Sequence, residues 1–494
     1  MSENNSLPKT PAPLEGEQEV KETKHRMPKL WEALLSFGVL IAFMAAGIVI
    51  FGVDPHFPMF LGVCFAAFMA MRLGYKWEEI ETAMKDGIYR ALQAVVILMI
   101  VGILIAVWIL GGVVPAMIYY GMKLLSPSIF LIAALLICSI TSLATGTSWG
   151  TMGTMGLALI GIGTGLGMPI GPTAGAVISG AYFGDKLSPL SDTTNLAPAM
   201  AGTDVFTHVK YMLKSTILAY VIALVFFGVY GFMHASSGAV DSSQAVVIMD
   251  GIRNNFHVSP VLLLPPLVVI LAIAFKVPAI PGITLGFIAA LILAPICQPG
   301  VTIGALLDVS LNGFVCETEL ESLNELLSSG GLLNMAFSIL MVMIAMMFGG
   351  IMEGTRQMEV IIEAVLKVVK GPAALIGATE LTAVFANAIM AEQYISILIP
   401  GRMFAPAYRE KGIHPKSLSN ALESAGTVTS CLIPWNTCGV FIATNLGVLW
   451  SQYAPWAVFN YTMPIICFIM AFMGITVTKM TPEEQEKADR GELV

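Results

Sequence analysis

The sequence predicts an all-α polytopic membrane protein with about 14 crossings, built from two inverted-topology five-helix repeats with discontinuous helices. The first observation behind this is composition: 56% of the 494 residues are hydrophobic and only 12% are charged, with a mean hydropathy of +0.80. Soluble proteins carry about 25% charged residues. The second is a series of apolar runs as long as a membrane-spanning helix, which takes about 20 residues. The third is a set of landmarks that recurs at a nearly fixed spacing.

The order of the segments follows from apolar runs and from the basic residues beside them. Residues 1–30 are polar, contain Pro8, Pro11 and Pro13, and lack the apolar core of a signal peptide, which predicts a disordered cytoplasmic tail. Lys and Arg next to the runs place both termini in the cytoplasm. The expected units are two N-terminal spans (31–75), a first repeat (76–234), an extracytoplasmic loop, two linking spans and an acidic loop (235–330), a second repeat (331–478) and a cytoplasmic tail (479–494).

The expected crossings are apolar runs separated by short polar stretches. They lie at about 32–53, 59–71, 88–110, 127–144, 149–167, 172–201, 211–233, 260–275, 278–295, 332–350, 373–388, 392–401, 418–449 and 456–476. The loop 297–331 contains five acids and no Lys or Arg, so it is expected outside the cell. The first repeat then starts inside the cell and the second repeat starts outside it. The two repeats should therefore have opposite orientations in the membrane.

Recurring landmarks support a duplication. Pro127 returns as Pro372 and Pro189 returns as Pro434, and the interval along the chain is the same for both pairs. The double glycine at Gly111 returns at Gly349 after a slightly shorter interval. Interrupted helices at matching positions of two inverted halves are the best sequence indication of a transporter binding site.

The stretch 179–195 is the most polar segment at the expected membrane depth. A charge at the bilayer centre costs roughly 2.5–3.5 kcal/mol, so Asp185, Lys186 and Asp192 need partners, water or an ion there. Pro189 removes a backbone donor and is expected to break the helix, which frees carbonyl groups. Oxygen ligands suit hard cations, and a carboxylate can also accept a proton.

We therefore expect a Na⁺/H⁺ site formed by both breaks and a hydroxyl-rich turn, with Asp185 as first choice of carboxylate. Its candidate ligands are Asp185, Asp192, Ser188, Thr145, Thr147, Ser148, Asn195, Glu423, Thr427, Thr429, Asn436 and Asn387. Candidates for contact with a larger substrate are Lys186, Glu392 and Gln393. The alternative reading of the small hydroxyl residues is helix packing. A salt bridge could join Lys186 to Glu423, and Glu392 could lie at the surface.

Other patterns indicate no further chemistry. The seven cysteines are scattered singly, which supports neither a zinc site nor a disulfide framework. The glycine-rich run 161–167 lacks the strand and acid of a dinucleotide loop, so helix packing is expected. Residues 146–150 match GxSxG, with Ser148 as nucleophile, but no strand precedes them and no histidine is expected at membrane depth, so an enzyme is disfavoured. A channel remains a further alternative.

Two segments, Gly146-Thr-Ser-Trp-Gly-Thr151 and 179–195, closely resemble the NhaC family of Na⁺/H⁺ antiporters, as do 392–394 and 423–427 in the second half. The resemblance covers most of the chain from about Leu30. It implies a fold of inverted repeats with crossed broken helices, a homodimer, elevator-like movement, and Na⁺ extrusion against H⁺ entry in a bacterial inner membrane. One branch of the family resembles malate/lactate exchangers.

The sequence thus predicts a secondary transporter that exchanges Na⁺ for H⁺, with organic acid exchange as the alternative. For an organic acid, Lys186, Asn195, Asn387 and Asn436 would supply the cationic or amide groups. No cofactor is expected beyond the transported ions. The expected partners are membrane lipids, Na⁺, H⁺ and, in the alternative, malate or lactate, with no nucleic acid.

Overall fold

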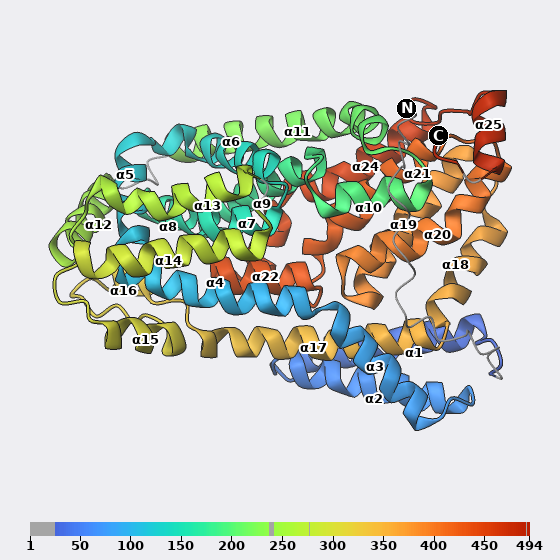
Figure 1. The fold of residues 1–494 in the computed structure, drawn as a ribbon, viewed down its shortest axis with the longest axis horizontal. Coiled ribbons are helices and arrows are strands. Elements are labelled where there is room, and N and C mark those ends of the chain that lie inside the picture. The colour runs from blue at the N-terminus through green and yellow to red at the C-terminus, as the bar shows by residue number, and fades with distance from the viewer. Residues whose placement is uncertain (1–24, 237–241, 276, 491) are drawn as a thin grey trace, which may run out of the picture.

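A computed structural model describes residues 25–236, 242–275, 277–490 and 492–494. The predicted N-terminal tail lies outside these ranges up to residue 24. In the described part the chain is helical, and its only β-type pairings are two isolated bridges, Phe314 with Ser329 and Ile413 with Lys479. Most helices run along the long axis of the molecule (Figure 1). Both ends of the described chain lie at one end of this axis, and α12, α15 and α16 lie at the other.

The N-terminal helices form a layer against α17. They are α1 (Leu30–Ala45), which continues as a π-helical turn (Ala46–Ile50), α2 (His56–Arg72) and α3 (Trp77–Arg90). The basic residues of 72–90 predict a cytoplasmic loop, but most of this segment is the amphipathic helix α3, whose buried residues Ile80, Met84 and Gly87 recur at helical spacing. Gly87 meets Gly350 of α17 so closely that a Cβ at Gly87 would lie 2.1 Å from the Met346 carbonyl oxygen.

The next helices follow in sequence order. They are α4 (Leu92–Leu110), α5 (Val113–Leu124), α6 (Pro127–Thr145), α7 (Ser148–Thr151), a π-helical turn (Met152–Gly156), α8 (Leu157–Gly165), α9 (Ile170–Leu187), α10 (Asp192–Ala201) and α11 (Val205–Ser236). The linking part contains α12 (Ser242–Asn255), a 3₁₀ turn (Pro260–Leu263), α13 (Leu264–Ala274), α14 (Ala279–Cys297), α15 (Ile303–Asn312) and α16 (Glu321–Leu327). The acidic loop thus carries two short helices.

A second series has the same order of long and short helices. It comprises α17 (Leu332–Gly354), α18 (Gln357–Val368), α19 (Pro372–Met390), α20 (Gln393–Glu410), α21 (Pro415–Leu422) with a π-helical turn (Glu423–Thr427) and a 3₁₀ turn (Ser430–Leu432), α22 (Thr437–Leu446), α23 (Trp450–Tyr453), a 3₁₀ turn (Ala454–Trp456) and α24 (Val458–Phe472). Helix α25 (Pro482–Asp489) follows at the C-terminus. The starts of α6 and α19, of α9 and α21, and of α10 and α22 are all separated by the interval that also separates Pro189 from Pro434.

Seven described helices are long and apolar enough to cross a membrane, or up to nine if each of two bent helix pairs is one span. Several expected crossings do not pass this test because their helices are short or interrupted. The segment 172–201 is divided into α9 and α10, and 418–449 is divided at residues 433–436. The interruptions occur at the two prolines that the sequence singled out, while the number of fourteen crossings remains a prediction.

Small residues allow the central helices to approach closely. On α9, a Cβ at Gly180 would lie 2.3 Å from the Leu135 carbonyl oxygen of α6, and one at Gly184 would lie 2.4 Å from the Ser139 carbonyl oxygen. Such small-residue contacts are the usual interface of membrane helices. The glycine-rich run on α8 packs in the same way, because a Cβ at Gly161 would lie 2.5 Å from the Ile118 side chain.

Candidate ion-binding site

Two helix reversals occur at equivalent places in the two series. Between α6 and α7 the chain turns at Gly146 (φ +68°), and between α19 and α20 it turns at Ala391 (φ +54°). The residue after each turn caps the next helix. Thr147 Oγ1 accepts a hydrogen bond from Gly150 N (3.1 Å), and Glu392 Oε2 accepts one from Ile395 N (3.0 Å). Each turn therefore places a polar side chain at the start of a buried helix.

Two helix breaks face these reversals. The first, 188–191, follows α9, and Thr194 Oγ1 donates to the carbonyl oxygens of Asp185 and Lys186 (3.1 Å each). These are the carbonyls that Pro189 is expected to free. The second break, 433–436, ends at Asn436, whose Oδ1 caps α22 through Cys438 N (3.0 Å). Gly146 touches the first break, because a Cβ there would lie 2.7 Å from the Leu190 carbonyl carbon.

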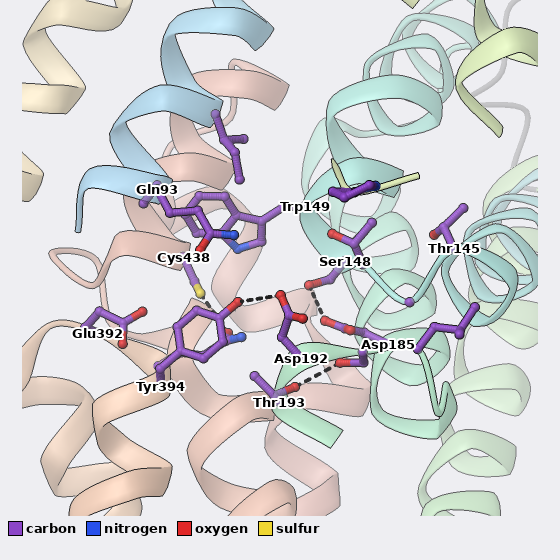
Figure 2. A pocket seen from close by; sticks show the side chains of 18 of the residues that line it. Gln93, Thr145, Ser148, Trp149, Asp185, Asp192, Thr193, Glu392, Tyr394 and Cys438 are labelled. Atoms are coloured by element: carbon purple, nitrogen blue, oxygen red, sulfur yellow. Dashed lines mark hydrogen bonds between the residues drawn. The ribbon is translucent and has the colours of Figure 1, made fainter. Parts of the chain in front are cut away.

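A cavity of about 910 Å³ opens where the reversals and the first break meet (Figure 2). Its lining comes from both halves of the chain. It includes Arg90 and Gln93 from the α3–α4 junction, Thr145 to Trp149, Asp185, Leu190 to Thr193, Glu392 to Ile395, and Cys438. Such a concave space with few, convergent polar groups is the usual form of a small-ligand site.

Asp185 is the most enclosed carboxylate of the cavity. Only 4% of its surface is exposed, and its Oδ2 accepts a hydrogen bond from Ser148 Oγ (2.7 Å). This bond joins the end of α9 to the start of α7 (Figure 2). Asp192, at the start of α10, is exposed toward the same space and accepts a long bond from the Tyr394 hydroxyl (3.4 Å). A carboxylate and a hydroxyl in contact at a helix break can provide oxygen ligands to a cation.

The opposite wall is built around Gln393. Its Oε1 accepts from Cys438 Sγ (2.9 Å) and from Ser430 Oγ (3.1 Å), which ties α20 to the second break. Trp149 stacks on Phe441 of α22 with ring centroids 4.2 Å apart. Glu392 is buried, with 7% exposure, so the surface position considered for it is wrong.

Other candidate residues lie behind the wall and do not line the cavity. Glu423 is one of these residues. Its Oε1 accepts a hydrogen bond from Oγ1 of Thr193 (3.2 Å), a residue that does line the cavity. Lys186 Nζ donates to Ser424 Oγ (3.2 Å). The ion pairs found within 4.0 Å among the described residues do not include Lys186 with Glu423, so the considered salt bridge is not formed.

The amide and hydroxyl candidates of the second half largely satisfy each other. Asn387 Nδ2 donates to the Gly426 carbonyl (2.6 Å) and to Thr429 Oγ1 (3.2 Å), and Asn436 Nδ2 donates to the Asn387 carbonyl (3.1 Å). The Thr427 hydroxyl is buried and has no hydrogen-bond partner among the described residues.

The remaining candidates belong to the first break and the first reversal. Ser188 Oγ accepts from Leu190 N (3.3 Å), and Asn195 Nδ2 donates to the Pro189 carbonyl (2.9 Å). Thr145 lines the cavity, and its hydroxyl makes one long bond to the Ser142 carbonyl (3.5 Å).

Some lining residues are not identified as site residues by the sequence. Arg90 and Gln93 fall in the first residues of the expected crossing 88–110, where polar side chains are typical of the membrane interface, so neither is singled out. Arg90 forms an ion pair with Glu353 of α17. A basic and an amide residue close together at the start of a buried helix were the available signal. Tyr394 and Cys438 also line the cavity. They lie close in sequence to candidate site residues, but no motif of their own marks them as site residues.

Comparison with known proteins gives a consistent result. The model of the Na⁺/H⁺ antiporter family matches residues 180–475. The chain is 36% identical to the Na⁺/H⁺ antiporter NhaC of Alkalihalophilus pseudofirmus, over 90% of this chain and 96% of that protein. It is 38% identical to the NhaC of Bacillus subtilis (85% and 93%) and 37% identical to the malate-2H⁺/Na⁺-lactate antiporter of Bacillus subtilis (94% and 99%). This chain therefore belongs to the Na⁺/H⁺ antiporter family.

Proposed function

We propose that this protein is a secondary active transporter that exchanges Na⁺ for H⁺ by alternating access, with Asp185 as the carboxylate that binds either ion. The observation that carries the proposal is the buried contact of Asp185 with Ser148, at the junction of a helix reversal and a helix break. An enclosed carboxylate is costly when charged and alone. Either Na⁺ or a proton neutralises it, so the two ions compete for one group.

The energy available from protons is sufficient for this exchange. One pH unit corresponds to about 1.4 kcal/mol per proton, which supports a tenfold Na⁺ gradient at one-to-one exchange. The family membership of the chain and the names of its relatives support Na⁺ and H⁺ as the ions.

The architecture that we propose has two inverted repeats, 76–234 and 331–478, and about fourteen membrane crossings. We further propose that the protein lies in a bacterial inner membrane with both termini in the cytoplasm. Three pairs of helix starts and two pairs of capping residues, Thr147 with Glu392 and Ser191 with Asn436, recur at one common interval and support the duplication. Homodimer formation also belongs to this proposal, on the resemblance alone.

The test is Na⁺ uptake into proteoliposomes driven by an imposed pH gradient. Wild-type protein should accumulate ²²Na⁺ when the lumen is acidic, and Asp185→Asn should not. The matched control is Asp54→Asn, which removes a carboxylate in the 51–55 segment outside the cavity lining and should leave uptake unchanged. Na⁺ uptake by Asp185→Asn at the wild-type rate would exclude the assigned carboxylate.

A second candidate function is organic acid exchange, favoured by the size and lining of the cavity. A volume of about 910 Å³ is far larger than a bare cation needs, and Arg90 and Gln93 could bind a carboxylate. The malate/lactate relative points the same way. In the same vesicles, a Na⁺ flux that depends on malate in wild type and is lost in Arg90→Gln would support this function. A wild-type Na⁺ flux that is the same with and without malate or lactate would exclude it.

A further inference from the structure

The contact that carries the proposed ion site has a counterpart in the second half of the chain. Moved along the sequence by the interval that relates the two helix breaks, Ser148 becomes Gln393 and Asp185 becomes Ser430. The counterparts also touch, since Ser430 Oγ lies 3.1 Å from Gln393 Oε1. In both halves the contact joins the first residue of the helix after a reversal to a residue shortly before a helix break. The two contacts are therefore equivalent in position.

The two contacts differ in charge. The first contains the carboxyl group of Asp185, and both of its side chains line the cavity. The second contains an amide and a hydroxyl, neither of which ionises in a protein at ordinary pH. Gln393 lines the opposite side of the cavity and is 5% exposed, whereas Ser430 is fully enclosed behind it. The second contact is thus a neutral version of the first.

A third position differs in the same direction. Thr193, which lines the cavity beside the first contact, has Cys438 as its counterpart on the other side (Figure 2). Cys438 Sγ lies 2.9 Å from Gln393 Oε1. Hard cations prefer oxygen ligands, whereas the sulfur of cysteine is a soft ligand. The second half therefore lacks both the charge and one of the oxygen atoms that suit Na⁺.

The acid next to Gln393 is not the counterpart of the ion-binding carboxylate. Glu392 corresponds to Thr147, and each of these side chains caps the helix that follows it. Glu392 Oε2 accepts from Ile395 N (3.0 Å), as Thr147 Oγ1 accepts from Gly150 N (3.1 Å). The capping function is thus kept in both halves, while the contact one residue later is charged in one half and neutral in the other.

We propose that Gln393 is a specificity-determining residue, which together with Cys438 keeps cations out of the second half of the cavity and leaves them to Asp185. The proposal rests on the proposed Na⁺/H⁺ exchange. It makes the two related breaks respond differently to the ions. The neutral contact at the second break forms without an ion, whereas the enclosed carboxylate before the first break requires a cation or a proton. Ion exchange then acts on the first break, and the second break stays docked on α20.

The test supplies the missing charge and measures equilibrium binding of ²²Na⁺ to the purified protein at alkaline pH. Gln393→Glu should bind about twice as much Na⁺ per chain at saturation as wild type, because it creates a second carboxylate beside a hydroxyl. Asp185→Asn should bind none, and adding Gln393→Glu to it should restore binding. Adding Cys438→Thr as well should lower half-saturating Na⁺ further, because it supplies the oxygen that Thr193 has in the first half.

The matched control is Gln93→Glu, which places the same charge in the cavity lining at an amide that makes no hydrogen bond among the described residues. Combined with Asp185→Asn, it should not restore Na⁺ binding. If it restores binding as well as Gln393→Glu does, any added charge suffices, and the special role of Gln393 is overturned. Absence of binding in Asp185→Asn/Gln393→Glu overturns the proposal too.

A second variant decides if Gln393→Glu does not fold, as judged by thermal unfolding in detergent. Gln393→Ser with Ser430→Asp rebuilds the pair of the first half at the equivalent positions and should also bind a second Na⁺; wild-type binding in this variant overturns the proposal. Wild-type Na⁺ binding by Asp185→Asn alone would instead contradict the carboxylate assigned to the exchange. The amount of Na⁺ bound by Gln393→Glu would then decide the role of Gln393 by itself.

Discussion

Replacing Ser148 with alanine tests the geometry of the proposed ion site directly. In the wild type, Ser148 Oγ donates to Asp185 Oδ2 at 2.7 Å, and both side chains are almost fully buried. A hydrogen bond to a charged group contributes about 1.5–3 kcal/mol. Because tenfold in affinity corresponds to about 1.4 kcal/mol, the loss of this bond should raise half-saturating Na⁺ by about 10- to 100-fold.

The assay is Na⁺-dependent dissipation of a pH gradient in everted vesicles, measured with a fluorescent pH indicator over a range of Na⁺ concentrations. The matched control is Ser142→Ala on α6. Ser142 is equally buried, but its hydroxyl donates to the Ala181 carbonyl (2.6 Å) and not to Asp185. Ser142→Ala should keep half-saturating Na⁺ within a few fold of wild type. If Ser148→Ala behaves like Ser142→Ala, Ser148 does not support the ion-binding carboxylate.

Three further predictions concern the frame of the site. Gly180→Ala should destabilise the protein by about 1–3 kcal/mol, because the added Cβ would meet the Leu135 carbonyl oxygen. Thermal unfolding in detergent measures this. The control is Gly38→Ala, whose added Cβ would meet nothing within 4 Å. Ala391→Gly should leave the free energy of unfolding unchanged or raise it by about 1 kcal/mol, because glycine adopts the positive φ of this turn without strain. The control is Ala388→Gly inside α19, which should lower the free energy of unfolding by about 1 kcal/mol in the same assay. His414 Nδ1 caps α21 by accepting from Lys416 N (3.1 Å), and burial lowers the pKa of this imidazole, so the start of α21 should loosen as the pH falls below about 6.5 and Nδ1 takes a proton. Hydrogen exchange of the first turn of α21 should show this in wild type and not in His414→Asn, which keeps an acceptor but does not titrate.

The positions of the helix interruptions could be predicted from the sequence because their causes are local. Pro189 and Pro434 cannot continue a helix, and the interval that they share with Pro127 and Pro372 relates the two breaks. The hydroxyl-rich turn at Thr145 to Ser148 was also recognisable, since its composition differs so clearly from its apolar surroundings. Asp185 stood out through the cost of its charge, and it lies in the cavity wall with 4% exposure.

Which of two neighbouring residues lines the cavity and which lies behind its wall could not be predicted from the sequence, because this depends on tertiary packing. Sequence alone does not distinguish Asp185, in the cavity, from Lys186, behind its wall. Glu392 gave no sign of burial, because its role as a helix cap depends on the left-handed turn at Ala391. Arg90 joins the lining because α3 is a helix that leads directly into α4.

The most direct measurement of the central claim is the binding of ²²Na⁺ to the purified protein over a range of pH. If Na⁺ and H⁺ share Asp185, half-saturating Na⁺ should increase steadily as the pH falls, by about tenfold per pH unit for each proton displaced. Asp185→Asn should then bind no Na⁺ at any pH. Na⁺ binding that is independent of pH, or that survives in Asp185→Asn, would contradict competition for this carboxylate.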